Sequence, residues 1–173
     1  MSRRADNPHG GQAITELALI VPVLLLLVIG VADLGRLYTT MAQTEAGARE
    51  AADYGAFQES NWTAQNYTST EAEMTRRACV ADLGLTDYVG APDGSSCSNP
   101  TVVVTIEGQD QNPSCPTAPP IPQGLDPPCI IHVESTYTFN TILRLPLIPS
   151  TLTFARDSRY AVSALPVPAT PAP

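Results

Sequence analysis

The hydrophobic pattern of the chain is dominated by one stretch near the N-terminus. Residues 17–32 contain no charged side chain, and Glu16 and Asp33 bracket them. This stretch is slightly shorter than the ~20 residues that cross a bilayer as a helix, and its flanking residues close the gap, so 12–36 is predicted as a transmembrane helix segment. Pro22 lacks a backbone donor, and we expect it to kink or loosen the helix locally.

The helical pattern continues beyond the apolar stretch. Residues 37–57 are rich in Ala, Glu, Gln, Met and Arg, which favour helix, and small residues recur among them at roughly helical spacing. One helix from about Gln12 to Phe57 would be on the order of 70 Å long. That length indicates a stalk that packs sideways against other helices. The alternative is a short linker helix beneath the domain that follows.

The rest of the chain alternates polar loops with short regular elements. A second helix is expected to begin near Ser69 or Thr70 and to end near Leu83–Gly84, with Glu71 and Glu73 in its first turn and Gly84 as a candidate residue just after its C-cap. Alternation of apolar and polar residues then predicts three strands, at 101–107, 130–139 and 152–162.

These elements define an α+β fold: a long N-terminal helix that lies partly in a membrane, a second helix and a small antiparallel three-stranded sheet. The 173 residues suit one membrane-anchored domain. The expected organisation is a leader at 1–11, the transmembrane segment at 12–36, its continuation as a stalk at 37–57, an extracytoplasmic domain at 58–165 and a disordered, proline-rich tail at 166–173.

The charge distribution restricts the partners and the orientation. The net charge is −8, and all nine basic residues are Arg. An acidic chain argues against a nucleic-acid partner, because phosphate contacts need clustered Arg and Lys. Arg3 and Arg4 precede the apolar stretch and favour a cytoplasmic N-terminus, whereas Arg36 just after it weakens that preference. The C-terminal domain is therefore expected on the extracytoplasmic side of the cytoplasmic membrane.

Four cysteines follow the apolar stretch, an even number in a region expected to be exported, and this indicates two disulfides. Four cysteines allow three connectivities. Chain order favours Cys79–Cys97 and Cys115–Cys129, each closing a loop worth about 3 kcal/mol in the chain-entropy model. A metal site is the competing interpretation, but thiolates this widely spaced lack the paired Cys-x2-Cys pattern.

The sequence contains no pattern typical of an active site. His9 lies in the leader and His132 in a predicted strand, and neither a nucleophile motif, a zinc-protease motif nor a phosphate-binding loop is present. We therefore expect no catalytic residues, no cofactor, no metal and no small-molecule substrate, and we expect the functional residues to be those of assembly.

The ends of the apolar stretch carry a specific combination of residues. They are Gly11-Gln12-Ala13, Glu16, Ala18, Pro22, Leu24–Leu27, Gly30 and Asp33-Leu34-Gly35-Arg36. This combination resembles the prepilin signal of type IV pilins, which is Gly-x4-Glu followed by an apolar helix. More narrowly, it resembles the N-terminal module of TadE-like (TadE/TadG-type) proteins, the minor pseudopilins of Tad or Flp pili. The resemblance is dense over about residues 10–57, and beyond them only the pilin-like architecture is shared.

The resemblance implies that a membrane prepilin peptidase cleaves after Gly11, so that Gln12 begins the mature protein. Glu16 would then neutralise the new amine, in its own chain or a neighbour, and set the register between stacked subunits. The implied partners, within membrane lipid, are other pilins and pseudopilins, the prepilin peptidase, and the inner-membrane Tad platform proteins with their secretion ATPase. The implied function is that of a structural minor pseudopilin that supports pilus assembly and adhesion.

Two alternatives to a pseudopilin stay open from the sequence. Gly30-Val31-Ala32 offers small residues at the −3 and −1 positions of a signal peptidase site, so cleavage before Asp33 would release a secreted, disulfide-bonded binding module. Without any cleavage, the chain would be a signal-anchored surface protein unrelated to pili. The helical pattern that continues across Asp33 and the carboxylate of Glu16 count against the secreted form.

Overall fold

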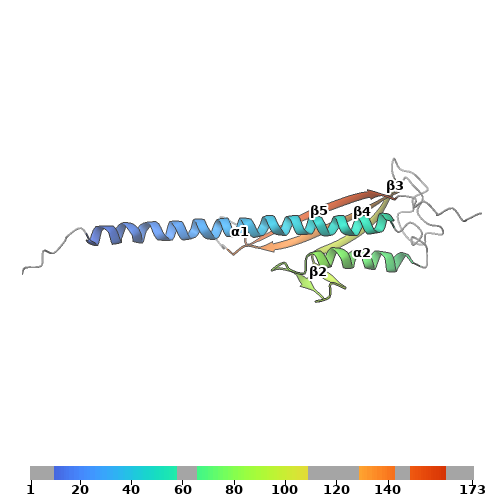
Figure 1. The fold of residues 1–173 in the computed structure, drawn as a ribbon, viewed down its shortest axis with the longest axis horizontal. Helices are drawn as coiled ribbons and strands as arrows, with labels where there is room; N and C mark the ends of the chain where they lie inside the picture. Colours follow the sequence, from blue (N-terminus) through green and yellow to red (C-terminus); the bar gives the residue numbers. More distant parts are fainter. Residues whose placement is uncertain (1–9, 58–65, 109–128, 143–148, 163–173) are drawn as a thin grey trace, which may run out of the picture.

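A computed structural model of the chain describes residues 10–57, 66–108, 129–142 and 149–162 (Figure 1). The helices are α1 (Gly10–Phe57) and α2 (Tyr67–Ala81), and the strands are β1 (Val89–Gly90), β2 (Cys97–Asn99), β3 (Thr101–Gly108), β4 (Cys129–Asn140) and β5 (Thr151–Ala161). The α+β class predicted from the sequence is confirmed, and the three predicted strands correspond to β3, β4 and β5.

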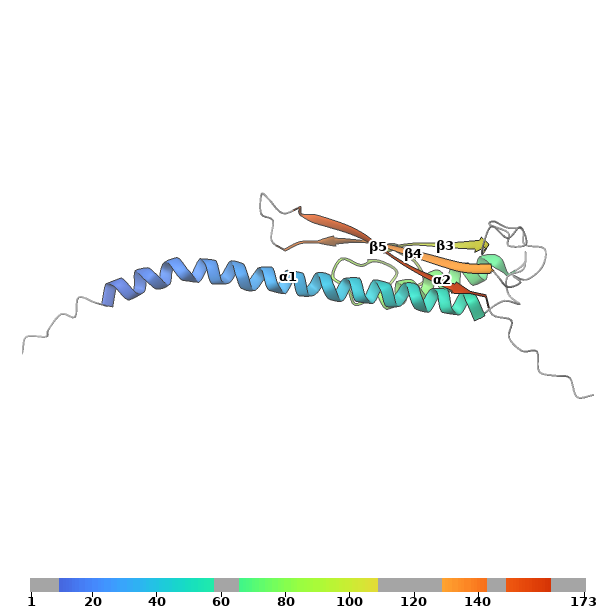
Figure 2. The ribbon, with the colours of Figure 1, turned by 90° about the horizontal axis from the view of Figure 1, so that it is seen from above.

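Helix α1 is continuous over 48 residues, which makes it about 70 Å long. It begins two residues before the predicted start at Gln12 and runs through Pro22 as uninterrupted helix with gentle curvature (Figure 2). Its N-terminal half stands clear of all other elements, and large apolar side chains such as Leu19 (76% exposed) and Val23 (63%) contact little else. Among the described residues, α1 is the one helix long and apolar enough to cross a membrane.

Strands β3, β4 and β5 form an antiparallel sheet with β4 in the centre. Alternate residues of β4, from Cys129 to Phe139, are buried, as the period-two pattern predicted. The opposite face of the sheet carries threonines and charged side chains. In this outer face, His132 Nδ1 lies 2.9 Å from Glu107 Oε1, and its Nε2 lies 3.6 Å from Asp157 Oδ2.

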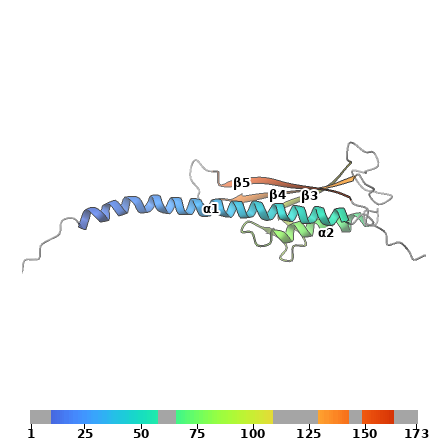
Figure 3. The same cartoon turned by 45° about the horizontal axis from the view of Figure 1, so that its top comes forward.

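Both helices cover the buried face of the sheet (Figures 2 and 3). The distal half of α1 packs against β4, β5 and α2, and α2 lies near β3. The core residues are Ala48, Ala51, Ala52, Met74, Ala78, Val104, Ile106, Cys129, Ile131, Val133 and Val162. Several of the small residues that recur at helical spacing in 37–57 therefore lie in this core. At Gly47, a Cβ atom would lie 2.9 Å from Ala81 Cβ, so glycine permits the close approach of α1 and α2.

The predicted boundaries of α2 are wrong by two to three residues. The helix begins at Tyr67 after the N-cap Asn66 and ends before the C-cap Asp82, so its first turn contains no acidic residue and Gly84 lies beyond its end. The physical reason is that the hydroxyls of Ser69 and Thr70 both donate to the carbonyl of Asn66, at 2.8 and 3.0 Å. They bond back within the helix and do not cap it.

A short hairpin of β1 and β2 joins α2 to the sheet, and the sequence analysis did not predict it. Its turn contains Gly94, whose φ of 72° lies in the left-handed region that favours glycine. A disulfide between Cys79 and Cys97, the pair that chain order favoured, ties α2 to β2 with a Cα–Cα distance of 5.7 Å. Cys129 is disulfide-bonded as well, and Cys115, its predicted partner, lies outside the described residues.

Candidate functional site

The predicted processing site lies at the free end of the apolar helix. Helix α1 includes Gly10, so the peptide bond between Gly11 and Gln12 is within its first turn. The side chain of Glu16 is exposed one turn further along, on the segment that packs against no other element. The leader before residue 10 lies outside the described residues.

The second cluster of candidate residues surrounds the point where α1 leaves its apolar half. We call Asp33, Arg36, Thr86, Asp87, Asn140 and Ile142 the collar. Asp33 is only 8% exposed, and its carboxylate has two partners from different parts of the chain. Arg36 Nη1 donates to its Oδ1 at 3.1 Å, and the backbone N–H of Ile142 donates to its Oδ2 at 3.0 Å. Asp33 thereby fastens the end of β4 to the helix.

Arg36 links the same helix position to two further elements. Its Nη2 donates to the hydroxyl of Thr86 at 2.6 Å, in the connection between α2 and β1. Its guanidinium lies 5.1 Å from the ring centroid of Phe139, which is buried on β4. The ion pair with Asp33 keeps both charges partnered at a position where a membrane would begin, and this matters because an unpaired charge there is costly.

Asp87 completes the collar on the side of the hairpin. Its Oδ2 accepts from the backbone N–H of Asn140 at 2.9 Å, and its Oδ1 accepts from the Asn140 side-chain amide at 3.0 Å. The neighbouring N–H of Thr141 donates to the carbonyl of Ser150 at 3.0 Å. Three successive backbone donors, at residues 140, 141 and 142, are therefore satisfied at this end of the sheet.

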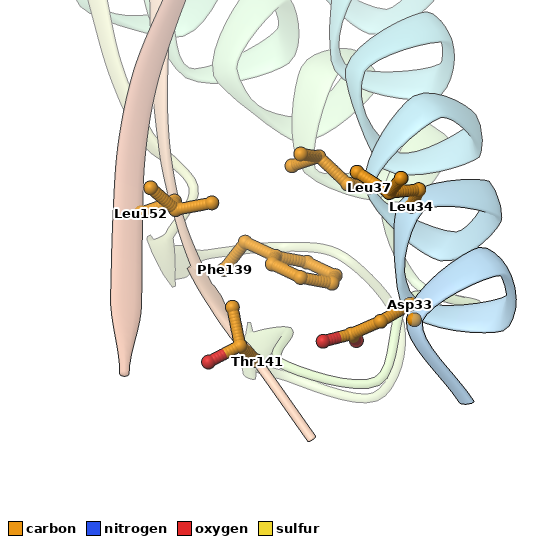
Figure 4. Close-up of a pocket in the computed structure, with 7 residues that line it drawn as sticks. Asp33, Leu34, Leu37, Phe139, Thr141 and Leu152 are labelled. Carbon is orange, nitrogen blue, oxygen red and sulfur yellow. The ribbon is translucent and has the colours of Figure 1, made fainter. Parts of the chain in front are cut away.

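A small cavity of about 110 Å³ lies inside the collar, between α1 and the ends of β4 and β5 (Figure 4). Its lining residues are Gly30, Asp33, Leu34, Leu37, Phe139, Thr141 and Leu152. In Figure 4, Phe139 extends from β4 toward Leu34 and Leu37 on the helix, and the Asp33 carboxylate points toward Thr141. The lining is mostly apolar, and Leu34 is 67% exposed at its rim.

A buried carboxyl joins the two helices farther from the membrane segment. Asp82 is 1% exposed, and its Oδ1 accepts from the Thr44 hydroxyl on α1 at 3.4 Å. Its Oδ2 has no hydrogen-bond partner among the described residues. Burial raises the pKa of Asp82 from 3.8 to about 7, against the smaller opposing effect of the Thr44 hydrogen bond.

Charged side chains also connect the helices on their exposed side. Arg77 donates to Glu50 on α1 at 3.2 Å and to Glu73 at 3.0 Å, and its guanidinium lies 4.2 Å from the Tyr54 ring centroid. The hydrogen bond from Arg76 holds the pKa of Glu73 below its usual range. Within the described ranges, no group of three His, Cys, Asp or Glu side chains is placed to hold a metal ion.

Sequence reasoning missed the collar as a site. Asp33 and Arg36 entered it as the end of the apolar stretch and as part of the TadE-like resemblance, and Thr86, Asp87 and Asn140 carried no pattern at all. A usable signal was present: a carboxylate and an arginine three residues apart at the end of an apolar helix are neighbours on one helix face. Their hydrogen-bond partners Ile142 and Thr86 lie 109 and 50 residues away, and no local pattern reports them.

Among the described residues, one long helix is apolar enough to cross a membrane, and an α+β domain is built onto its distal half. Residues 11–53 match the family model described as TadE-like protein, so this segment of the chain is similar to that family. The match spans the predicted processing site, the apolar half of α1, Asp33 and Arg36, and it ends within the distal half of α1. No curated protein and no solved structure matches the chain.

Proposed function

We propose that the chain is a minor pseudopilin of a Tad-type pilus, inserted in the cytoplasmic membrane with its N-terminus inside and cleaved after Gly11. The observation that carries this proposal is the combination of a TadE-like module at residues 11–53 with an apolar half-helix that no other element covers. The domain contributes a folded head, and the helix contributes the part that a membrane or a bundle of pilin helices would surround.

The proposed chemistry of assembly is electrostatic and not enzymatic. Cleavage after Gly11 creates an ammonium at Gln12, four residues before Glu16, which is about one helical turn. A carboxylate within an apolar span costs about 2.5–3.5 kcal/mol at the centre of a membrane helix, and less near its end. An ammonium of the same chain or of a neighbouring subunit lowers that cost by attracting the charged carboxylate. Glu16 thereby favours one register between stacked helices.

The partners follow from the same reasoning. Other pilins and pseudopilins would pack along the uncovered half of α1, and the prepilin peptidase and Tad platform proteins would act on the membrane-inserted form. The length of the domain beyond the helix favours a supporting subunit over the bulk filament protein. We assign adhesion to the assembled pilus and not to this subunit. A direct role of the subunit in adhesion would require a ligand-binding surface on its head.

The decisive measurement is the first residue of the mature protein, by mass spectrometry of the membrane fraction in a host that carries its own Tad system. We expect a start at Gln12 that is lost in Gly11→Lys and retained in Ala32→Leu, which blocks the alternative signal peptidase site without adding charge. A start at Asp33 that is lost only in Ala32→Leu would contradict the proposal and support a secreted module. An uncut chain would indicate a signal anchor.

A second experiment separates processing from assembly. We expect Glu16→Gln to be cleaved normally but to be lost from sheared pili, because the amide cannot neutralise the new amine. Glu45→Gln is the matched control, since Glu45 lies on the same helix beyond the apolar half and pairs with Arg49. Equal incorporation of the Glu16→Gln and Glu45→Gln variants would contradict the role assigned to Glu16.

A further inference from the structure

The end of the sheet that is fastened to the collar carries exposed apolar side chains that the fold itself leaves uncovered. Ile142, just after β4, is 58% exposed. Leu34 and Tyr38, one helical turn apart on α1, are 67% and 75% exposed. We call these three residues the foot of the domain. They lie at or next to the collar, whereas most of the buried apolar core lies beside the part of α1 that follows.

The position of the foot relative to a membrane follows from the length of the helix. Residues 13–32 rise about 30 Å, which is the thickness of the hydrocarbon core. With the core beginning at Ala13, its far edge falls near Asp33, within the segment 12–36 predicted to cross the membrane. Because Asp33 accepts the backbone N–H of Ile142 at 3.0 Å, Ile142 lies at the same height as this edge. Tyr38 lies just above it, at the level where tyrosine is enriched in membrane proteins.

The backbone N–H groups at the foot all have acceptors within the protein. Unsatisfied N–H groups cost several kcal/mol in hydrocarbon. The N–H groups of Asn140, Thr141 and Ile142 donate to Asp87, Ser150 and Asp33, respectively. Among the described residues of the collar, Asp33 and Arg36 form an ion pair, and the Asp87 carboxylate accepts two hydrogen bonds from Asn140. These bonds satisfy the backbone at this end of the sheet, so contact with lipid would leave none of these three N–H groups without an acceptor.

From this geometry we infer that the foot is a lipid-binding surface: Ile142, Leu34 and Tyr38 rest in the headgroup and upper acyl region of the membrane that α1 crosses. The apolar cavity behind Leu34 opens at the same level and gives hydrocarbon a place beside Phe139 and Leu152. The inference rests on the proposed membrane insertion of α1. It adds that the domain lies against the bilayer and is not held away from it by a stalk.

The test places a fluorescent probe at the foot of the full-length protein in lipid nanodiscs. In a Trp62→Phe background, Ile142→Trp is compared with Leu24→Trp, in the apolar span, and with Val103→Trp. Val103 is a partly exposed apolar residue (48%) on the outer face of β3. Each variant is measured in lipids brominated near the headgroup end or near the methyl end of the acyl chain. The correct Cys79–Cys97 disulfide, checked by mass spectrometry, controls for folding.

We expect Ile142→Trp to lose fluorescence mainly with bromine near the headgroup end and Leu24→Trp mainly with bromine near the methyl end, with no loss for Val103→Trp. Quenching of Leu24→Trp without quenching of Ile142→Trp would overturn the lipid surface and leave the membrane anchor intact. In that case, blue-shifted and unquenched emission from the Ile142→Trp variant would mean that protein, and not lipid, covers this position. Absence of quenching in both variants would overturn the insertion of α1 together with this inference.

Discussion

The buried carboxyl of Asp82 is expected to make the fold weaken as the pH rises. In the unfolded chain this group ionises near 3.8, whereas burial raises its pKa in the fold to about 7. Between those pH values the folded state holds a proton that the unfolded state has released, so the free energy of unfolding falls with rising pH and levels off above about pH 7. The separation of the two pKa values corresponds to about 4 kcal/mol.

Asp82→Asn removes the ionisation and keeps the shape of the side chain. The amide oxygen can still accept from Thr44, but the amide N–H groups replace an oxygen that has no partner among the described residues. We expect the burial of amide N–H groups without an acceptor to lower the free energy of unfolding by about 1–3 kcal/mol at every pH. The variant should therefore be less stable than the parent near pH 4 and more stable above about pH 7, with a crossover between.

The measurement is urea unfolding of the full chain in nonionic detergent, without reductant, followed by near-ultraviolet circular dichroism from pH 4 to pH 8. Lowered pKa values, such as those of Glu73 and Asp93, act in the opposite direction, but they are common to both proteins and cancel in the difference. Asp53→Asn, an exposed carboxylate on α1, is the matched control. A difference between parent and Asp82→Asn that stays constant over this range would refute the reasoning.

Two further predictions concern the collar and the helix contact. Asp33→Ala leaves the Ile142 N–H without its acceptor and should destabilise this end of the sheet by about 1–3 kcal/mol. Hydrogen exchange should then accelerate at Ile142 and not at Val133 in the centre of β4, and equal protection in both proteins would contradict the role of Asp33. Gly47→Ala should destabilise the domain by about 1–3 kcal/mol through overpacking against Ala78 and Ala81, less about 1 kcal/mol gained from helix propensity. At Gly35 a Cβ meets nothing within 4 Å, so Gly35→Ala should stabilise the domain through helix propensity alone. The same urea denaturation measures whether the two substitutions change the free energy of unfolding in opposite directions.

The helix and the sheet could be predicted from the sequence because their signals are local and repeated. The apolar stretch and the helix-favouring residues after it placed α1 to within two residues at its start. Alternation along β4 identified its buried residues, since every second side chain of a strand faces the same side. The strand boundaries were correct to within one residue for the same reason.

The collar and the ends of α2 could not be predicted in this way. Asp33 and Ile142 are 109 positions apart, and Arg36 and Thr86 are 50 apart, so only the folded chain brings them together. At α2, the sequence offered several hydroxyls as caps, and Ser69 and Thr70 bond back to Asn66 inside the helix. The β1–β2 hairpin is too short for any periodic pattern, because its strands contain two and three residues.

The collar also has a mechanical consequence. The domain is fastened to α1 at Asp33 and Arg36 and packed against it as far as Ala56, so the helix and the head form one lever. In the proposed membrane-inserted form, the fulcrum of this lever would lie at the membrane surface. The distal half of the helix, residues 33–57, is about 36 Å long, so a helix tilt of about 20° moves its far end sideways by about 12 Å. A neighbouring subunit that tilts the apolar half of α1 would therefore also displace the outermost surface of the head, because the helix is continuous between the two.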